Sequence, residues 1–81
     1  MDLVNYDNLK EGSKVTLKPE PRLFDTLSYR NFYSNDQKRR EIAKKWGNRM
    51  VTVRKVEANL HYFSTLEAGN FPFFAIAHLT N

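Results

Sequence analysis

The chain of 81 residues contains no cysteine and only three glycines. Without cysteine it can form neither a disulfide framework nor a cysteine-based zinc site, so the hydrophobic core alone must stabilise the fold. Three glycines are too few for the glycine-rich loops that bind phosphate groups. A small domain without disulfides is typical of a reducing compartment, and we therefore expect a cytoplasmic protein.

Long hydrophobic runs are also missing. No segment approaches the ~18 apolar residues of a membrane span, and residues 1–7 lack the basic start and apolar stretch of a signal peptide. We expect neither secretion nor membrane insertion. A chain of this length has room for one core, and its content of 41% hydrophobic and 14% aromatic residues is enough to build it. The sequence predicts a single globular domain over residues 1–81.

Catalytic and metal-binding motifs are lacking as well. His61 and His78 stand alone, with no HExxH spacing and no paired acidic motif nearby, so a metal ion would lack ligands. There is no GxSxG motif of a serine hydrolase. We therefore expect no enzyme, no metal and no cofactor. A small ribonuclease-type toxin, with an active site of mixed arginine, histidine and acidic residues, stays open as a minor alternative.

Four segments have the apolar and β-branched patterns of strands. The predicted strands cover residues 13–18, 49–56, 61–66 and 73–79. In the second of them, Val51 and Val53 share a face, but Val56 is out of phase with both. This predicts a bulge near Arg54 and Lys55, of the kind that bends strands in small barrels. Closely spaced antiparallel strands in a short chain favour a barrel, because closure removes exposed sheet edges.

The long connection between the first two strands begins as a loop and continues as a helix. Pro19 and Pro21 end the first strand, so residues 19–33 are predicted to be mostly loop, with at most one helical turn around Leu23. This loop carries several aromatic residues, and we expect it to fold back over the core.

Ser34 and Gln37 match a capping box, and Gly47 supplies the left-handed residue that ends many helices. The sequence therefore predicts a helix over residues 35–46. Its apolar face is thin and consists of Ile42, Ala43 and Trp46. We expect Ile42 and Trp46 to attach the helix to the body of the protein, with most of its circumference in water.

Several of these segments resemble a known group of proteins. They are LKEGSKV at residues 9–15, WGNRMVTVRKV at residues 46–56, and the aromatic residues 62–63 and 71–74. The pattern resembles the small SH3-like domains common in phages, prophages and Firmicute genomes. The resemblance implies a mainly β fold of the α+β class: a small SH3-like antiparallel β-barrel with a helix inserted in the long loop between strands 1 and 2. Most members have no assigned activity, so the resemblance implies fold more than function.

Charge is concentrated on the predicted helix and its exit. Residues 34–49 hold six basic and two acidic side chains, whereas the rest of the chain balances, so the whole net charge of +4 arises there. A basic exposed helix is typical of proteins that bind nucleic acid or an acidic protein surface, but a solvated helix kept soluble by charge accounts for it equally well. The candidate binding residues are Lys38, Arg39, Arg40, Lys44, Lys45 and Arg49, with Tyr29 and Tyr33 as aromatic contacts.

These observations favour a small binding module that binds nucleic acid through its basic helix, and the resemblance implies that phages are one source of such a module. The alternative is a protein-binding module or inhibitor that engages an acidic host protein through the same face. No membrane and no small-molecule cofactor is expected among the partners.

Overall fold

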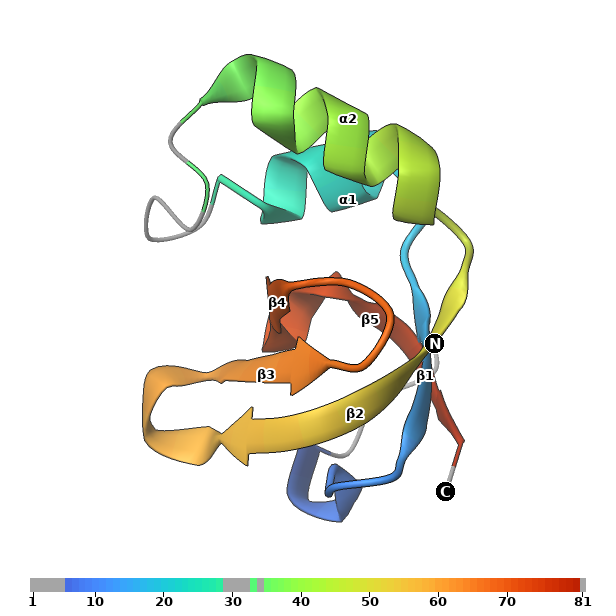
Figure 1. Cartoon of the computed structure of the whole chain (residues 1–81), viewed down its shortest axis with the longest axis vertical. Coiled ribbons are helices and arrows are strands. Elements are labelled where there is room, and N and C mark those ends of the chain that lie inside the picture. The colour runs from blue at the N-terminus through green and yellow to red at the C-terminus, as the bar shows by residue number, and fades with distance from the viewer. Residues whose placement is uncertain (1–5, 29–32, 34, 81) are drawn as a thin grey trace.

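The structure, a computed structural model, describes residues 6–28, 33 and 35–80. In this part the chain forms a small α+β domain with a five-stranded antiparallel sheet and two α-helices. The two helices lie together above one end of the sheet (Figure 1). They are α1 (Glu20–Thr26) and α2 (Asp36–Trp46), and both fall between the first two strands in sequence. Neither helix is long and apolar enough to cross a membrane, a finding that covers the described residues only.

The strands follow the order β4-β3-β2-β1-β5 across the sheet. Their bounds are β1 (Lys14–Leu17), β2 (Met50–Glu57), β3 (Tyr62–Thr65), β4 (Asn70–Pro72) and β5 (Ile76–Thr80). Strands β4 and β5 form the two edges, and no ladder joins them in the described part of the chain. The sheet is therefore not closed into the barrel that the sequence predicted. β4 has only three residues and ends at a proline, which cannot donate to a further ladder.

The predicted strand over residues 73–79 is divided in the structure. Residues Phe73–Ala75 form a short 3₁₀ turn, η4, and β5 begins only at Ile76. Phe73 and Ala75 are buried on either side of the exposed Phe74, but Ala75 and Ile76 are buried next to each other, so the alternation of a strand is broken between these two residues. The bulge predicted in β2 is confirmed, because the pairing of β2 with β3 shifts register between Val53 and Lys55.

Residues 20–26 form helix α1, so the prediction of a loop with at most one helical turn is wrong. Pro21 lies at the start of α1, where the missing N–H costs no helical hydrogen bond. The backbone nitrogen of Leu23 donates to the Pro19 carbonyl at 2.8 Å, and that of Leu27 to the Leu23 carbonyl at 2.9 Å. Leu23 and Leu27 are fully buried. Their burial outweighs the weak helical signal of the local sequence.

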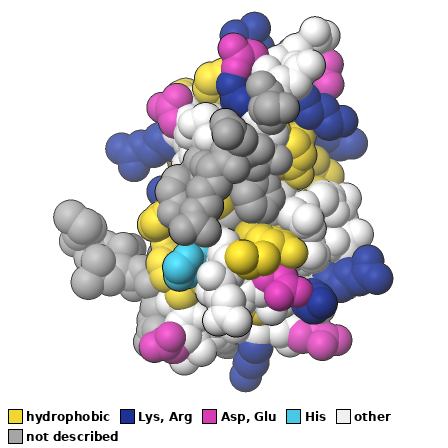
Figure 2. Space-filling model, turned by 90° about the vertical axis from the view of Figure 1, so that its left-hand side faces the viewer, with side chains coloured by type: hydrophobic (Ala, Val, Ile, Leu, Met, Phe, Trp, Pro, Cys, Tyr) yellow, Lys and Arg dark blue, Asp and Glu magenta, His cyan; other side chains and the backbone are white. Residues whose placement is uncertain are grey.

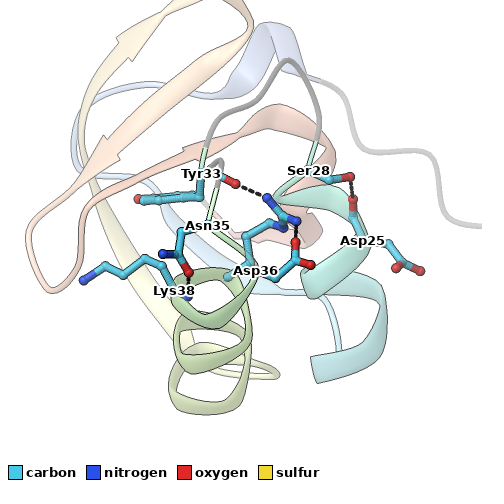
Figure 3. Close-up of polar contacts among 7 residues, drawn as sticks. Asp25, Ser28, Tyr33, Asn35, Asp36 and Lys38 are labelled. Carbon is cyan, nitrogen blue, oxygen red and sulfur yellow. Dashed lines mark hydrogen bonds and ion pairs between the residues drawn. The ribbon is translucent and has the colours of Figure 1, made fainter.

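Helix α2 agrees closely with the predicted helix, but its two ends differ in detail. Asn35 is the N-cap, since its side-chain oxygen accepts a hydrogen bond of 3.1 Å from the Lys38 amide (Figure 3). Ser34, the predicted cap, lies outside the described residues. At the other end Gly47 has φ −56°, so it is not the left-handed residue; Asn48, with φ 63°, has that role.

The core lies between the sheet and the helices. Val15, Leu17, Val51 and Val53 from the central strands are buried together with Phe63 and Phe71, and the helices add Leu23, Leu27 and Ala43. Ile42 and Trp46 also pack against this core, which confirms their predicted role in attaching α2. Both remain half-buried, so part of the Trp46 indole is open to solvent.

Candidate functional site

The exposed basic residues of α2 lie in two rows on different faces of the helix. Arg40 and Lys44 are one turn apart and flank a shallow hollow that also includes Glu41. Lys38 and Lys45 are two turns apart, about 10 Å along the axis, and face the sheet side of the helix. The structure thus divides the predicted basic cluster instead of gathering it into one patch.

Arg39 is turned inward and interacts with the protein itself. Its guanidinium forms an ion pair with Asp36 and donates a hydrogen bond to the Tyr33 carbonyl (Figure 3). The group also lies 5.6 Å from the centre of the Phe24 ring, and only 13% of the side chain is exposed. Arg39 therefore links Tyr33 to α2 and contacts Phe24 of α1, and little of its charge is exposed to solvent.

The remaining predicted residues have different surroundings. Arg49 is exposed but follows the end of α2, so it does not continue the helical row of Lys45; its carbonyl accepts a hydrogen bond from the Leu17 amide at 2.9 Å. Tyr29 lies outside the described residues. Tyr33 is half-buried, and its hydroxyl donates to the Asn70 carbonyl at 2.9 Å. Burial raises the pKa of the Tyr33 hydroxyl, and this hydrogen bond offsets part of the rise.

A groove runs between α2 and the turn that joins β3 to β4. We call it the helix–turn groove. One wall is α2, with Lys38, Glu41, Ile42, Lys45 and Trp46; the other is the turn, with Glu67, Ala68 and Gly69; Tyr33 and Phe71 complete the lining. The groove encloses about 410 Å³. Its floor is apolar and aromatic, whereas charged side chains stand on its rim.

The Trp46 indole is the largest apolar group in this groove. The Lys45 ammonium lies 5.5 Å from the centre of the indole ring, within the range of a cation–π interaction. Gly69 stands opposite, and a Cβ atom there would come within 3.1 Å of the Tyr33 hydroxyl oxygen. The lack of a side chain at Gly69 therefore keeps both the groove open and the Tyr33 hydroxyl in place.

The turn wall is held by a network that the sequence analysis did not predict. The Glu67 carboxylate accepts hydrogen bonds from the Thr52 amide at 2.7 Å and from the Thr52 hydroxyl at 3.0 Å. The Lys14 ammonium donates to the same hydroxyl at 2.6 Å. Partial burial raises the pKa of the Glu67 carboxyl, but the hydrogen bonds from Thr52 and the charge of Lys14 outweigh it, so that pKa lies below its ordinary value.

Charges of both signs surround the helical layer. In Figure 2, Lys and Arg side chains border the upper, helical part of the molecule, and Asp and Glu side chains stand among them. Glu41 lies between Lys38 and Lys45 in the groove wall. The basic residues of α2 are therefore interspersed with acidic groups.

No metal centre is found among the described residues. No group of three or more His, Asp or Glu side chains is placed to hold a metal ion there. His61 follows a short 3₁₀ turn after β2, whereas His78 lies in edge strand β5 opposite Thr16, so the two histidines belong to different parts of the fold. The arrangement around α2 can bind a partner through contacts and charge.

Comparison with known proteins yields no relative. The chain matches no protein-family model, and neither the search of curated proteins nor that of solved structures finds a similar protein. The function must therefore be argued from the geometry of the chain itself.

Proposed function

We propose that the protein is a non-enzymatic binding module whose helix–turn groove holds a polypeptide segment carrying acidic residues. One observation carries the proposal: the half-buried Ile42 and Trp46 form an apolar floor, with the buried Phe71 behind it, beside two exposed lysines, Lys38 and Lys45. Apolar side chains of the segment contact the floor, and its carboxylates meet the lysines. An apolar centre with a polar rim is the usual anatomy of a protein–protein interface.

The groove suits a polypeptide better than a nucleic-acid backbone. Its rim includes Glu41 and Glu67 as well as the lysines, so a polypeptide can place its few carboxylates at the lysines alone, whereas the regularly spaced phosphates of a nucleic acid would also meet the two glutamates. The groove also contains the half-buried Trp46, and tryptophan is one of the residue types enriched among the contacts that contribute most to binding energy at protein interfaces. The resemblance to phage and prophage SH3-like domains makes an acidic host protein one source of such a segment.

Nucleic-acid binding is the second candidate, and a different surface favours it. Arg40 and Lys44 form an exposed row on the outer side of α2, away from the groove, in a chain of net charge +4. Two phosphate contacts from this row would contribute about −1.8 to the slope of log affinity against log salt on duplex DNA. The two candidates therefore depend on different pairs of residues of the same helix.

We also propose that the fold is SH3-like. The strand order β4-β3-β2-β1-β5, the short η4 turn between the last two strands and the long insertion after β1 support this assignment. In such an arrangement the insertion between β1 and β2 is the variable part of the molecule. Here the insertion supplies the helical wall of the groove, and the turn between β3 and β4 supplies the other wall.

A random dodecapeptide library, selected against the whole protein, tests the polypeptide proposal. We expect the selected peptides to combine Asp or Glu with a large apolar residue and to change the fluorescence of the single tryptophan, Trp46, on binding. In the variant with Lys38→Gln and Lys45→Gln, their affinity should fall by roughly tenfold, at about 0.7 kcal/mol for each lost ion pair at the rim.

The matched control is the variant with Arg40→Gln and Lys44→Gln, which removes the same charge from the other row of α2. Peptide affinity should stay within about twofold of wild type there, since these residues do not line the groove. The opposite result, salt-dependent binding of random DNA or RNA that is lost only in this control variant, would replace the polypeptide proposal with nucleic-acid binding.

A further inference from the structure

A second cavity, of about 430 Å³, opens beside η1 (Tyr6–Asn8), away from the helix–turn groove. Three rings line it. The Tyr6 and Phe73 rings are stacked with their centres 5.2 Å apart, and the His61 ring meets Phe73 edge to face at 5.8 Å. The remaining walls are aliphatic and come from Leu9, Val56 and Ala58. We call this cavity the aromatic pocket.

The backbone fixes His61 at the edge of this pocket. Its φ of 57° is left-handed, a conformation that few side chains adopt and in which histidine is enriched. The His61 amide donates to the Ala58 carbonyl at 3.3 Å, and the His61 carbonyl accepts from the Phe73 amide at 2.9 Å. The ring is thus held against the connection between β4 and β5.

The charge of the aromatic pocket is opposite to that of the whole chain. Asp7 is the one acidic residue of the lining, which includes no lysine or arginine among the described residues, although the protein carries a net charge of +4. Burial raises the pKa of the Tyr6 hydroxyl, so this phenol remains neutral at physiological pH. An aromatic ring carries partial negative charge on its face and attracts cations there. Phe73 is buried behind the stacked Tyr6 ring, so the pocket offers a carboxylate, the rings of Tyr6 and His61, and an aliphatic wall.

We propose that the aromatic pocket binds an organic cation with a short alkyl body, of the alkylammonium type. Asp7 and the rings contact the ammonium group, and Leu9, Val56 and Ala58 contact the alkyl chain. Small-molecule sites commonly have this composition, with mostly apolar walls and a few polar groups that orient the ligand. The site is independent of the helix–turn groove, since the two cavities share no residue.

Titration of the isotope-labelled protein with n-butylammonium, followed by amide chemical shifts, tests the proposal. We expect saturable shifts at the amides of Ala58, His61 and Phe73, and none at Gly69 in the groove. Butan-1-ol has the same alkyl chain without the charge, and its affinity should be at least threefold weaker. Equal binding of the alcohol and the ammonium would overturn the proposal, because the pocket would then select apolar molecules alone.

A pair of variants tests the charge of the pocket. Asp7→Asn should weaken n-butylammonium by about threefold, since it removes an exposed charge pair of about 0.7 kcal/mol and leaves the ring contacts in place. Asp25→Asn removes an exposed carboxylate from α1, outside the pocket, and should leave the affinity unchanged. An affinity that is the same in Asp7→Asn as in wild type would overturn the proposal. Amide spectra of each variant verify that the fold is retained.

The ammonium group can belong to a free amine or to a lysine side chain. A second titration, with two peptides, distinguishes these two kinds of ligand. The capped tripeptide Gly-Lys-Gly is compared with the capped tripeptide Gly-norleucine-Gly, its uncharged counterpart. If the lysine peptide binds at least as tightly as n-butylammonium, the pocket accepts a side chain of a polypeptide. If n-butylammonium binds and the lysine peptide does not, the ligand is a free amine. If neither binds, the proposal is wrong.

Discussion

Gly47 is required by the close approach of two backbone segments. A Cβ atom there would lie 2.7 Å from the Ala43 carbonyl oxygen and 2.8 Å from the Glu20 backbone nitrogen. These are backbone atoms, which cannot move aside as a flexible side chain can. The backbone angles of Gly47 are open to any residue, so its role is one of space.

We expect Gly47→Ala to destabilise the protein by about 1–3 kcal/mol, the usual cost of forcing an extra methyl group into a packed site. Urea unfolding measures this change. Gly12 differs from Gly47, because its role is one of backbone conformation. Its φ is 90°, and no atom lies within 4 Å of the position that a Cβ atom would occupy. Asn tolerates a left-handed backbone, so Gly12→Asn should cost less than Gly12→Ala. Gly47→Asn should cost at least as much as Gly47→Ala; the reverse order would contradict the steric explanation.

Glu67 should make stability depend on pH. The pKa of the Glu67 carboxyl in the folded protein lies below its ordinary value of 4.5. The ionised carboxylate therefore stabilises the fold fully at a pH above about 4.5, and this stabilisation is lost as the pH falls through the pKa of the folded protein. At pH 7 we expect Glu67→Gln to lower the free energy of unfolding by about 1 kcal/mol. The substitution replaces a charged hydrogen-bond acceptor of the buried Thr52 amide by a neutral one, which is weaker. Near pH 2 the difference from wild type should shrink toward zero.

The measurement is urea unfolding of both proteins at several pH values. Glu41→Gln serves as the control, because the Glu41 side chain is exposed and lies on the opposite wall of the groove, away from Thr52. A Glu67→Gln variant whose deficit is the same at pH 7 and pH 2 would show that the carboxylate charge has no role in holding the turn.

At the scale of elements, the attachment of α2 rests on few apolar contacts. Trp46 and Ile42 are half-buried, and Ala43 alone is fully buried on this helix. We expect Trp46→Ala to destabilise the protein by about 2 kcal/mol, less than the roughly 3–5 kcal/mol of a fully buried tryptophan. Thermal or urea unfolding measures this, with Met50→Ala, at a side chain that is 55% exposed, as the control. A loss equal to that of the control would mean that Trp46 does not anchor the helix.

Local signals predicted some elements well and others poorly. Helix α2 and strand β2 were predictable because capping residues, helix-forming side chains and β-branched residues act within a few positions of each other. Helix α1 was not, since Pro19 and Pro21 suggest a loop, and the helix is stabilised by burial of Leu23 and of Leu27, its C-cap, in a core built from residues far away in sequence. The division of the last predicted strand between Ala75 and Ile76 has the same cause, because Phe73, Ala75 and Ile76 are buried by tertiary packing.

The candidate site was predictable only in part. The basic residues of α2 follow from the sequence, but their separation into two rows depends on which face of the helix meets the core. Arg39 illustrates this, because only the structure reveals that its guanidinium is held by Asp36 and Tyr33. The groove itself joins α2 to a turn more than twenty residues away, and no local pattern links the two.

At the scale of the whole molecule, both helices belong to a single insertion between two strands that pair directly with each other. The insertion leaves the sheet after Lys18 and returns at Asn48, where the Asn48 amide donates to the Lys18 carbonyl at 3.1 Å. The Leu17 amide donates to the Arg49 carbonyl at 2.9 Å just beyond. These hydrogen bonds join the two ends of the insertion, and we call this junction the neck. It anchors the helical layer and with it one wall of the helix–turn groove.

This neck has a consequence for how the chain folds. Pairing β1 with β2 requires the ends of a loop of roughly thirty residues to meet, and the entropy lost in closing a loop increases with its length. Contacts between α1 and α2 are closer in sequence and form sooner. Once the two helices pack, with the Gly47 backbone against that of Glu20, the remaining gap between the strands spans only a few residues. We therefore expect the packed helical pair to bring β1 and β2 close together before the rest of the sheet forms.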